Sequence, residues 1–232
     1  MFKQQKFKVD QDLEYKKFDQ INLDSKITKN IGLYIWGKPG VGKTTFLNKF
    51  KKDIHSRNNS LNKDYELNPN KYVIESNGIK YSYMPKMLNV HFCNMQQLVS
   101  DFKWNWNRDK DESKKTNKIP NFVKADVLLI DDLGAEHAHS STYEYIYELF
   151  NKRFDYIQKN KDKKMYTLIS SNFSIQELTE KYIRCFDDIN AERLISRISG
   201  LINYEINFIG IDKRWNEIKT DKEIDTEELE FD

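Results

Sequence analysis

The chain has 232 residues, enough for one large domain or for one domain with short appendages. Hydrophobic residues make up 38% of it and charged residues 32%, while an aromatic content of 13% can still fill a core. No apolar run approaches the length of a membrane span, and the N-terminus lacks the apolar core of a signal peptide, so we expect no membrane partner. Cys93 and Cys185 stand apart without a CxxC pair, which favours neither a disulfide framework nor a zinc site. The cytoplasm is the simplest compartment for such a chain.

The net charge of +2 is unevenly distributed along the sequence. From Lys219 to Asp232 two lysines stand against seven acids, so this segment carries −5 and the other 218 residues carry +7. A basic body can bind nucleic acid, although a mildly basic globular protein is the commoner explanation. We interpret the acidic end as a solvated tail.

Residues 1–30 are predicted to form a short helical extension, and the first strand follows at Ile31–Trp36, an apolar and aromatic run. A phosphate-binding loop comes next, because the sequence matches G-x-x-x-x-G-K-[ST] at every fixed position. Glycines let successive backbone N–H groups point into one concavity, and the helix that begins at Thr44 adds the positive end of its dipole. Lys43 is expected to reach the β- and γ-phosphates, and the Thr44 hydroxyl to bind Mg²⁺. The expected nucleotide-binding residues are Gly37, Lys38, Pro39, Gly40, Val41, Gly42, Lys43, Thr44 and Thr45.

An irregular stretch is expected from Asn58 to Pro69, after this first helix. Two β-rich runs, Lys71–Ser76 and Ile79–Met84, then flank Asn77-Gly78. Asn-Gly between such runs is a strong hairpin signal, because both turn positions need a positive φ. The sequence therefore predicts a hairpin at about 71–84, inserted ahead of the second core strand, which serves either as a contact surface or as a decorative insertion.

Leu88–Phe92 is predicted to be the second core strand, and Met95–Phe102 a helix. The polar stretch after this helix contains Trp104 and Trp106. Tryptophans among Lys, Arg and Asn can stack on the bases of a single strand. The alternative, which aromatic residues fulfil more often, is that they hold a long loop against the body.

A pair of acids follows the next predicted strand, at Val127–Asp132. The four apolar residues that begin this run are typical of a strand buried on both faces of a parallel sheet. Ligands bind at the carboxyl edge of such sheets, where the strand delivers Asp131 and Asp132. We expect Asp131 to hold Mg²⁺, directly or through water, and Asp132 to orient and polarise an attacking water.

The rest of the chain continues to alternate between helices and strands. Strands that alternate with helices predict an α/β fold with a doubly wound parallel sheet. The expected elements are an amphipathic helix at 145–159, a strand at 165–170 that Ser171-Asn172 ends, helices at 175–182 and 191–198, and a last strand at 202–209.

Taken together, these motifs resemble the AAA+ ATPases of the DnaC/DnaI helicase-loader and IstB group. The resemblance covers about residues 30–215 and keeps the order of the motifs. It implies a P-loop AAA+ ATPase domain at 31–215, with a parallel five-stranded sheet flanked by helices and no substantial C-terminal lid domain, between the extension and an acidic tail at 216–232. The motifs that carry it are the phosphate loop, Leu128–Glu136, Phe150–Arg153, Ile169–Ser174 and Arg193–Ile198.

The resemblance also implies roles for single residues. Asn172 matches the sensor-1 position, which contacts the γ-phosphate or the attacking water. Arg197 matches the arginine finger that reaches the nucleotide of a neighbouring subunit, and Arg193, one turn earlier, is the second candidate for that role. Arg214 matches a sensor-2-like arginine. For each arginine, a surface ion pair is the alternative.

The function implied is an ATPase that uses ATP and Mg²⁺, binds single-stranded DNA and helps to load a replicative DNA helicase. It would associate with itself or with a related AAA+ protein through the Arg197 face. Only about 30 residues precede the first strand, so the separate helicase-binding domain of the loaders is expected to be missing or reduced. An IstB-like transposition helper remains an alternative, as does a nucleotide-dependent switch with little hydrolysis, because Asp132 is shorter than the Glu of many AAA+ enzymes.

Overall fold

A parallel five-stranded sheet forms the centre of the computed structural model, which describes residues 30–108 and 118–210. The strand order is β4-β5-β6-β1-β7, and every pair of neighbours is parallel. This confirms the expected α/β class. The strands are β1 (Ile31–Trp36), β4 (Val90–Asn94), β5 (Val127–Leu133), β6 (Tyr166–Ser171) and β7 (Tyr204–Asn207).

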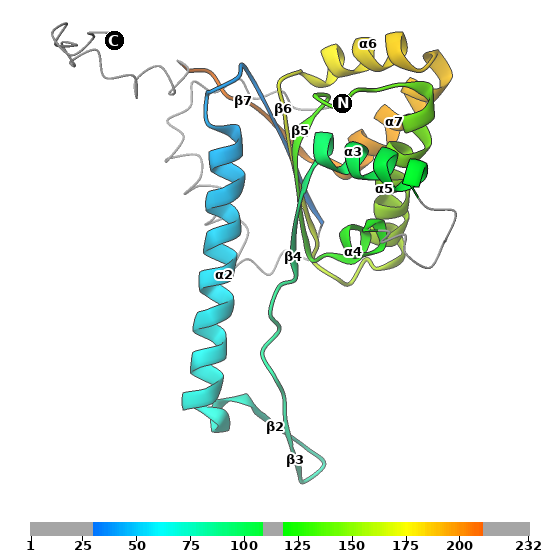
Figure 1. Ribbon diagram of the computed structural model, residues 1–232. Helices are drawn as coiled ribbons and strands as arrows, with labels where there is room; N and C mark the ends of the chain where they lie inside the picture. The colour runs from blue at the N-terminus through cyan, green and yellow to red at the C-terminus, as the bar shows by residue number, and fades with distance from the viewer. Residues whose placement is uncertain (1–29, 109–117, 211–232) are drawn as a thin grey trace, which may run out of the picture.

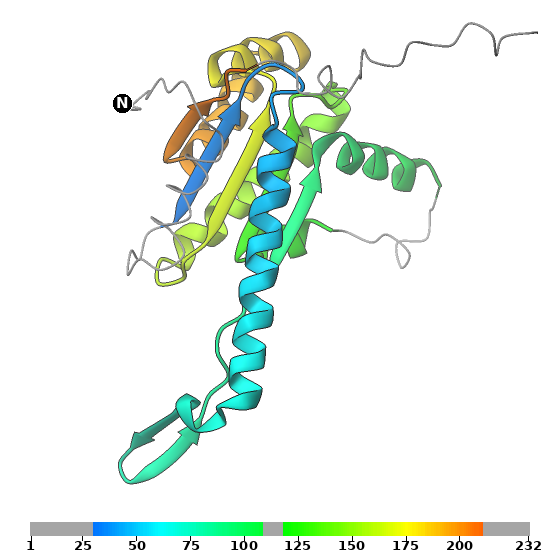
Figure 2. The ribbon, with the colours of Figure 1, turned by 90° about the vertical axis from the view of Figure 1, so that its left-hand side faces the viewer.

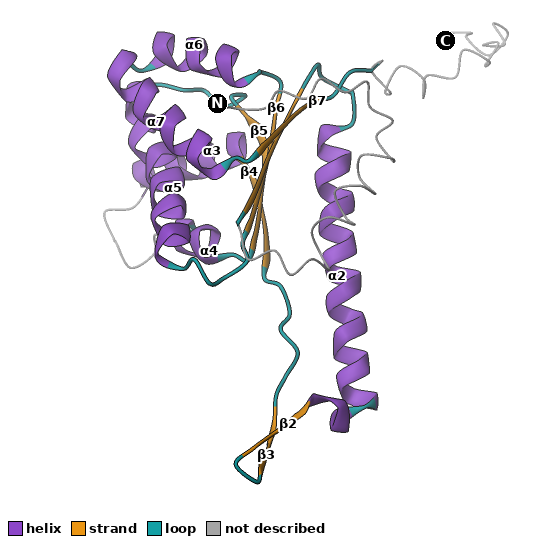
Figure 3. Cartoon of the chain, turned by 180° about the vertical axis from the view of Figure 1, so that it is seen from behind, coloured by secondary structure: helices purple, strands orange, loops and turns teal. Residues whose placement is uncertain are grey.

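Helices cover both faces of the sheet, but unequally (Figures 1 and 3). Helix α2 (Lys43–Leu67) lies alone on one face among the described helices. The other face carries α3 (Met95–Arg108), α4 (Ile119–Lys124), α5 (Ser140–Lys159), α6 (Ile175–Cys185) and α7 (Asp188–Leu201). None of the helices within the described ranges is long and apolar enough to cross a membrane.

Two hydrophobic cores result, one on each face, because successive side chains of a strand point to opposite sides. In β5, Val127 and Leu129 belong to the core under α2, while Leu128 and Ile130 belong to the core under α5 and α7. All four side chains are fully buried. The continuous apolar run of β5 therefore follows from burial on both faces, as the sequence predicted.

Strand β6 separates the phosphate loop from the acid pair. It pairs with β1 on one side and with β5 on the other, so Ser171 lies opposite both Trp36 and Leu133. Because the three strands are parallel, their carboxyl ends meet at one edge of the sheet. The loop after β1, the acids of β5 and Asn172 after β6 are thus brought together.

Helix α2 has 25 residues and continues past the edge of the sheet (Figures 1 and 2). The expectation of an irregular stretch from Asn58 onward is therefore wrong. Asn58 belongs to the helix, and its amide bonds both Leu88 N and Leu88 O, which ties α2 to the chain that returns to β4. Farther out, side chains four residues apart stabilise the exposed turns, such as Asn62 with Glu66.

The predicted hairpin is confirmed at the far end of this helix. A short 3₁₀ helix, η1 (Pro69–Tyr72), leads into β2 (Val73–Ser76) and β3 (Ile79–Ser82), which pair antiparallel around Asn77 and Gly78, both with positive φ. One face of the hairpin is apolar and exposed, with Ile74, Ile79 and Tyr81 each more than half exposed. We call α2 from Asn58 onward, together with η1 and this hairpin, the arm.

Other elements differ from prediction mainly at their ends. β4 begins at Val90 rather than Leu88, and α5 begins at Ser140 rather than Tyr145. The backbone at Trp104 and Trp106 belongs to α3, so the expected long loop does not begin there. α4 was not predicted. Arg214, the N-terminal extension and the acidic tail lie outside the described residues.

A buried arginine connects α5 to α4 and β6. Arg153 is fully buried, and its guanidinium lies where α4 ends and β6 begins. Burial lowers the pKa of Arg153 to about 10. The cation is stabilised here by carbonyl dipoles at a helix C-terminus, which favour positive charge. Its acceptors are the carbonyl oxygens of Phe122 (3.3 Å), Val123 (2.9 Å), Ala125 (2.5 Å) and Tyr166 (2.9 Å), and the hydroxyl of Thr167 (3.3 Å).

Candidate functional site

The loop between β1 and α2 has the backbone of an anion cradle. Gly37, Gly40 and Gly42 have φ values of 150°, 78° and 98°, which side chains other than glycine rarely adopt. A Cβ on Gly37 would also lie 2.3 Å from the carbonyl oxygen of Phe208. No side chain caps the N-terminus of α2, so the N–H groups of its first turn face the loop.

The buried side chain of Lys43 stabilises the cradle by hydrogen bonds to the loop backbone. Its side chain is 5% exposed, and its ammonium group donates to Gly37 O at 2.7 Å and to Lys38 O at 2.8 Å. A third hydrogen bond, of 2.8 Å, goes to Oδ1 of Asn172, which directly follows β6. Lys43 therefore connects the phosphate loop directly to the residue predicted as sensor 1.

The two residues predicted to bind a metal are also in contact. The Thr44 hydroxyl donates to Asp131 Oδ1 at 3.1 Å. The same carboxylate oxygen accepts a 2.5 Å hydrogen bond from the Ser170 hydroxyl. Asp131 is buried, whereas Thr44 is exposed. A hydroxyl and a carboxylate at this spacing fit Mg²⁺, which prefers oxygen ligands and keeps several of its waters.

Asp132 lies at a bulge in β5. Ile130 pairs with Ile169 and Leu133 with Ser171, so β5 has one residue more than β6 over this stretch, and Asp132 takes a positive φ of 57°. Its side chain is half-buried. Burial and the nearby charge of Asp131 raise the pKa of Asp132, while the charge of Lys43 opposes this shift. A carboxylate with a raised pKa is a better proton acceptor than an ordinary Asp.

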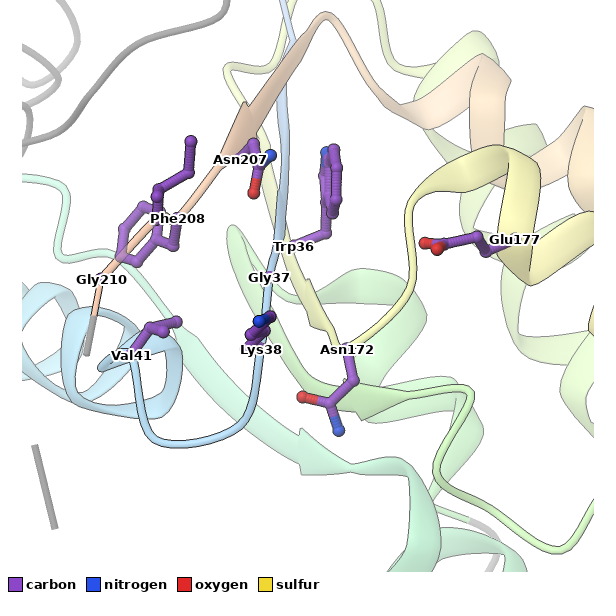
Figure 4. A pocket seen from close by; sticks show the side chains of 10 residues that line it. Trp36, Gly37, Lys38, Val41, Asn172, Glu177, Asn207, Phe208 and Gly210 are labelled. Carbon is purple, nitrogen blue, oxygen red and sulfur yellow. The ribbon is translucent and has the colours of Figure 1, made fainter. Parts of the chain in front are cut away.

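A pocket of about 330 Å³ adjoins the phosphate loop (Figure 4). Trp36 and Lys38 line it from the β1 side, Asn172 from β6, and Glu177 from α6, with its side chain pointing toward Trp36. Asn207 and the residues after it close the pocket from β7. The pocket thus opens beside the cradle and is large enough for part of a small ligand.

The two predicted arginines of α7 lie against α5. The Arg197 guanidinium lies 5.1 Å from the centre of the Phe154 ring, and that of Arg193 lies 5.8 Å from the Tyr147 ring, both on α5. The structure therefore places them on a shared face of α7, as the four-residue spacing predicted. They contact aromatic rings of α5 and are not members of the phosphate loop of their own chain.

Sequence reasoning included Ser170 and Ser171 in a motif but gave them no role, and the structure shows that they hold the backbone at the acid pair. The Ser170 hydroxyl accepts from Asp132 N at 3.2 Å, and the Ser171 hydroxyl donates to Leu133 O at 2.6 Å. Two hydroxyl residues at the end of an otherwise apolar strand were the available signal. A buried serine needs a hydrogen-bond partner, and here the partners belong to the next strand.

Comparison with known proteins agrees with this geometry. The KAP family P-loop domain matches residues 12–201 of the chain. No curated protein gives a significant match. Among solved structures, DnaI has a TM-score of 0.56 at 20% identity over 90% of this chain and 88% of its own. A putative primosome component from Streptococcus pyogenes serotype M3 has a TM-score of 0.51 at 17% identity, over 85% and 79% of the two chains. These likenesses show a shared fold.

Proposed function

We propose that this chain, which belongs to the KAP family of P-loop NTPases, is a Mg²⁺-dependent ATPase that acts in DNA replication in the cytoplasm. The observation that carries the proposal is the contact of Lys43 with Asn172, beside the contact of Thr44 with Asp131. These four side chains come from three elements, so they meet only in the folded sheet. Such groups are needed for ATP hydrolysis: a lysine to bind phosphate, a hydroxyl and a carboxylate to bind the metal ion, and an amide to contact the attacking water.

Each residue has a role that its position supports. Backbone N–H groups of residues 37–44 bind the phosphate oxygens, and Lys43 exchanges its loop carbonyls for the β- and γ-phosphates. Thr44 and Asp131 hold Mg²⁺, which neutralises charge on the phosphates when it is bound. Asp132 orients a water for in-line attack and accepts its proton, while Asn172 fixes the water or the γ-phosphate.

The proposed role in the cell is that of a DnaC/DnaI-like helicase loader, which binds single-stranded DNA and contacts a replicative helicase. Support comes from the fold shared with DnaI and with the primosome component, and from the motif order of the sequence. Arg197 is proposed to complete the site of a neighbouring subunit. Capture of a transposase instead of a helicase would favour the IstB-like alternative.

The first test is ATP binding and single-turnover hydrolysis by the purified chain, with and without single-stranded DNA. We expect Lys43→Ala to weaken ATP binding about 100-fold, because a buried charge-assisted contact is lost. Lys52→Ala, an exposed lysine of the same helix, is the control and should bind ATP like the wild type. Binding without any hydrolysis in the wild type would support the nucleotide-dependent switch instead.

Arg197 can be tested separately from the cradle. We expect Arg197→Ala to bind ATP normally but to lose the rise in turnover per molecule that comes with increasing protein concentration, because an arginine finger acts only between subunits. ATPase rates over a series of protein concentrations provide the measurement. Arg193→Ala, which loses a similar stacking contact, tests the second candidate: a rise lost in this variant and kept in Arg197→Ala would assign the finger to Arg193. A concentration dependence unchanged in Arg197→Ala would remove this residue as the finger.

A further inference from the structure

Hydrogen bonds hold several backbone groups of the turn that follows the acid pair. Ala135 N donates to Asp132 O at 3.0 Å, which closes the turn, and Gly134 within it has a φ of 89°. Serines of β6 hold Asp132 N and Leu133 O, as described above. The N–H and C=O groups of Gly134 are bound by residues outside the sheet.

Glu136 supplies the acceptor for the Gly134 N–H. Its side chain is 2% exposed, and Oε2 accepts from Gly134 N at 2.7 Å. The other oxygen, Oε1, accepts a 2.6 Å hydrogen bond from the Tyr182 hydroxyl of α6. Burial raises the pKa of Glu136, and these two donors oppose the shift. A carboxylate buried to this degree is costly, so both of its oxygens need donors.

Helix α6 also contacts the same turn directly. The Lys181 ammonium group donates to Gly134 O. A Cβ on Gly134 would lie 2.8 Å from Cδ1 of Leu178 and 2.9 Å from Cδ2 of Phe173, so only glycine allows this approach. Three residues of α6 therefore converge on Gly134, either directly or through Glu136.

We propose that Glu136 is a positioning residue, which fixes the Gly134 turn against α6 and thereby keeps Asp132 in its left-handed conformation. The proposal rests on the proposed ATPase function and adds to it a connection between α6 and the site. A left-handed backbone at a residue other than glycine persists only where its surroundings hold it. Without the Gly134 contact, Asp132 relaxes toward ordinary strand geometry, and its carboxylate leaves the position from which it orients water.

Glu136→Leu tests this by removing the acceptor at a similar side-chain volume. The carboxylate accepts from both Gly134 N and the Tyr182 hydroxyl, whereas leucine offers neither group an acceptor. We expect kcat to fall roughly 30-fold. The equilibrium affinity for ATP should change less than about twofold, because the phosphate loop keeps its contacts. If Glu136 only stabilised the fold, the variant would reduce the fraction of folded protein. The kcat per bound nucleotide would then stay unchanged.

Glu136→Gln provides the rescue. Its amide oxygen can accept from Gly134 N while its NH₂ group donates to the Tyr182 hydroxyl, which can also act as an acceptor, so kcat should lie well above that of Glu136→Leu. Thr167→Val is the matched control, since it removes a buried hydroxyl at the opposite end of β6. It should lower the melting temperature and leave kcat unchanged.

Two outcomes would overturn the inference, and they are distinguishable. If the wild type hydrolyses ATP and Glu136→Leu does so at the same rate per bound nucleotide, only the role of Glu136 fails. If the wild type binds ATP but never hydrolyses it, the proposed function fails, and the positioning role fails with it.

Discussion

Asp132→Asn is expected to hydrolyse ATP roughly 10³-fold more slowly than the wild type while binding it equally well. The amide has the size of the carboxylate and can still contact a water, but it cannot accept a proton. Pre-steady-state hydrolysis and equilibrium binding measure the two quantities separately. A variant that keeps its rate would show that Asp132 is not the group that polarises water.

The same substitution is expected to raise the melting temperature at pH 7 to 8. The pKa of Asp132 is raised in the folded chain, so between the ordinary carboxyl pKa and this raised value the folded state binds more protons than the unfolded state. Stability therefore falls as pH rises through that window, and above it the ionised Asp132 is a net cost. Asn carries no such cost.

The gain in melting temperature should shrink as the pH falls toward about 4, where an ordinary aspartate begins to be protonated. Thermal unfolding at several pH values would show this trend. Asp162→Asn, at an exposed position in the turn before β6, is the matched control and should change neither turnover nor melting temperature. A variant that melts lower than the wild type at neutral pH would contradict the argument.

Arg153→Ala is expected to destabilise the fold by about 4 kcal/mol or more, with a fall in melting temperature of roughly 10 °C. The change leaves buried carbonyl oxygens of α4 and β6 without a donor and opens a cavity beneath α5. Urea unfolding monitored by circular dichroism would measure the loss.

Two further variants separate the causes. Arg153→Met fills the volume but offers no donor, so it should remain strongly destabilised if the hydrogen bonds matter more than packing. Lys152→Ala removes the neighbouring exposed charge, which pairs with Glu148 on the surface, and should cost less than about 0.5 kcal/mol. Equal effects of Lys152→Ala and Arg153→Ala would be incompatible with a structural role for the buried guanidinium.

The sequence predicted the structure best at positions where few residue types can supply the required backbone conformation or chemical group. Glycines at fixed spacing before Lys43 predicted the cradle, and an apolar run that ends in two acids predicted β5 and its place at the sheet edge. Asn77-Gly78 predicted the hairpin turn. In each of these cases the local chemistry requires a particular backbone, so that no distant contact is needed to make the prediction.

Distant contacts decided the features that sequence reasoning missed. Asparagine as a residue type favours helix ends, yet Asn58 lies within α2. There its side-chain amide bonds the backbone of Leu88, 30 residues away. Arg153 was noticed only as part of a motif, since an arginine on an amphipathic helix is normally exposed. Its partners belong to β6 and to the unpredicted α4, so no local pattern reveals its burial.

The position of β6 in the sheet has a consequence for how the protein is made. β6 is the last of the three central strands to be synthesised, yet it must lie between β1 and β5. Until residues 166–171 have left the ribosome, the phosphate loop and the acid pair have no common support. Insertion of a middle strand closes two long loops at once, which is a slow, non-local step. A nascent chain that stops short of this strand has the glycines, the lysine and both acids, but they are not yet assembled into a site.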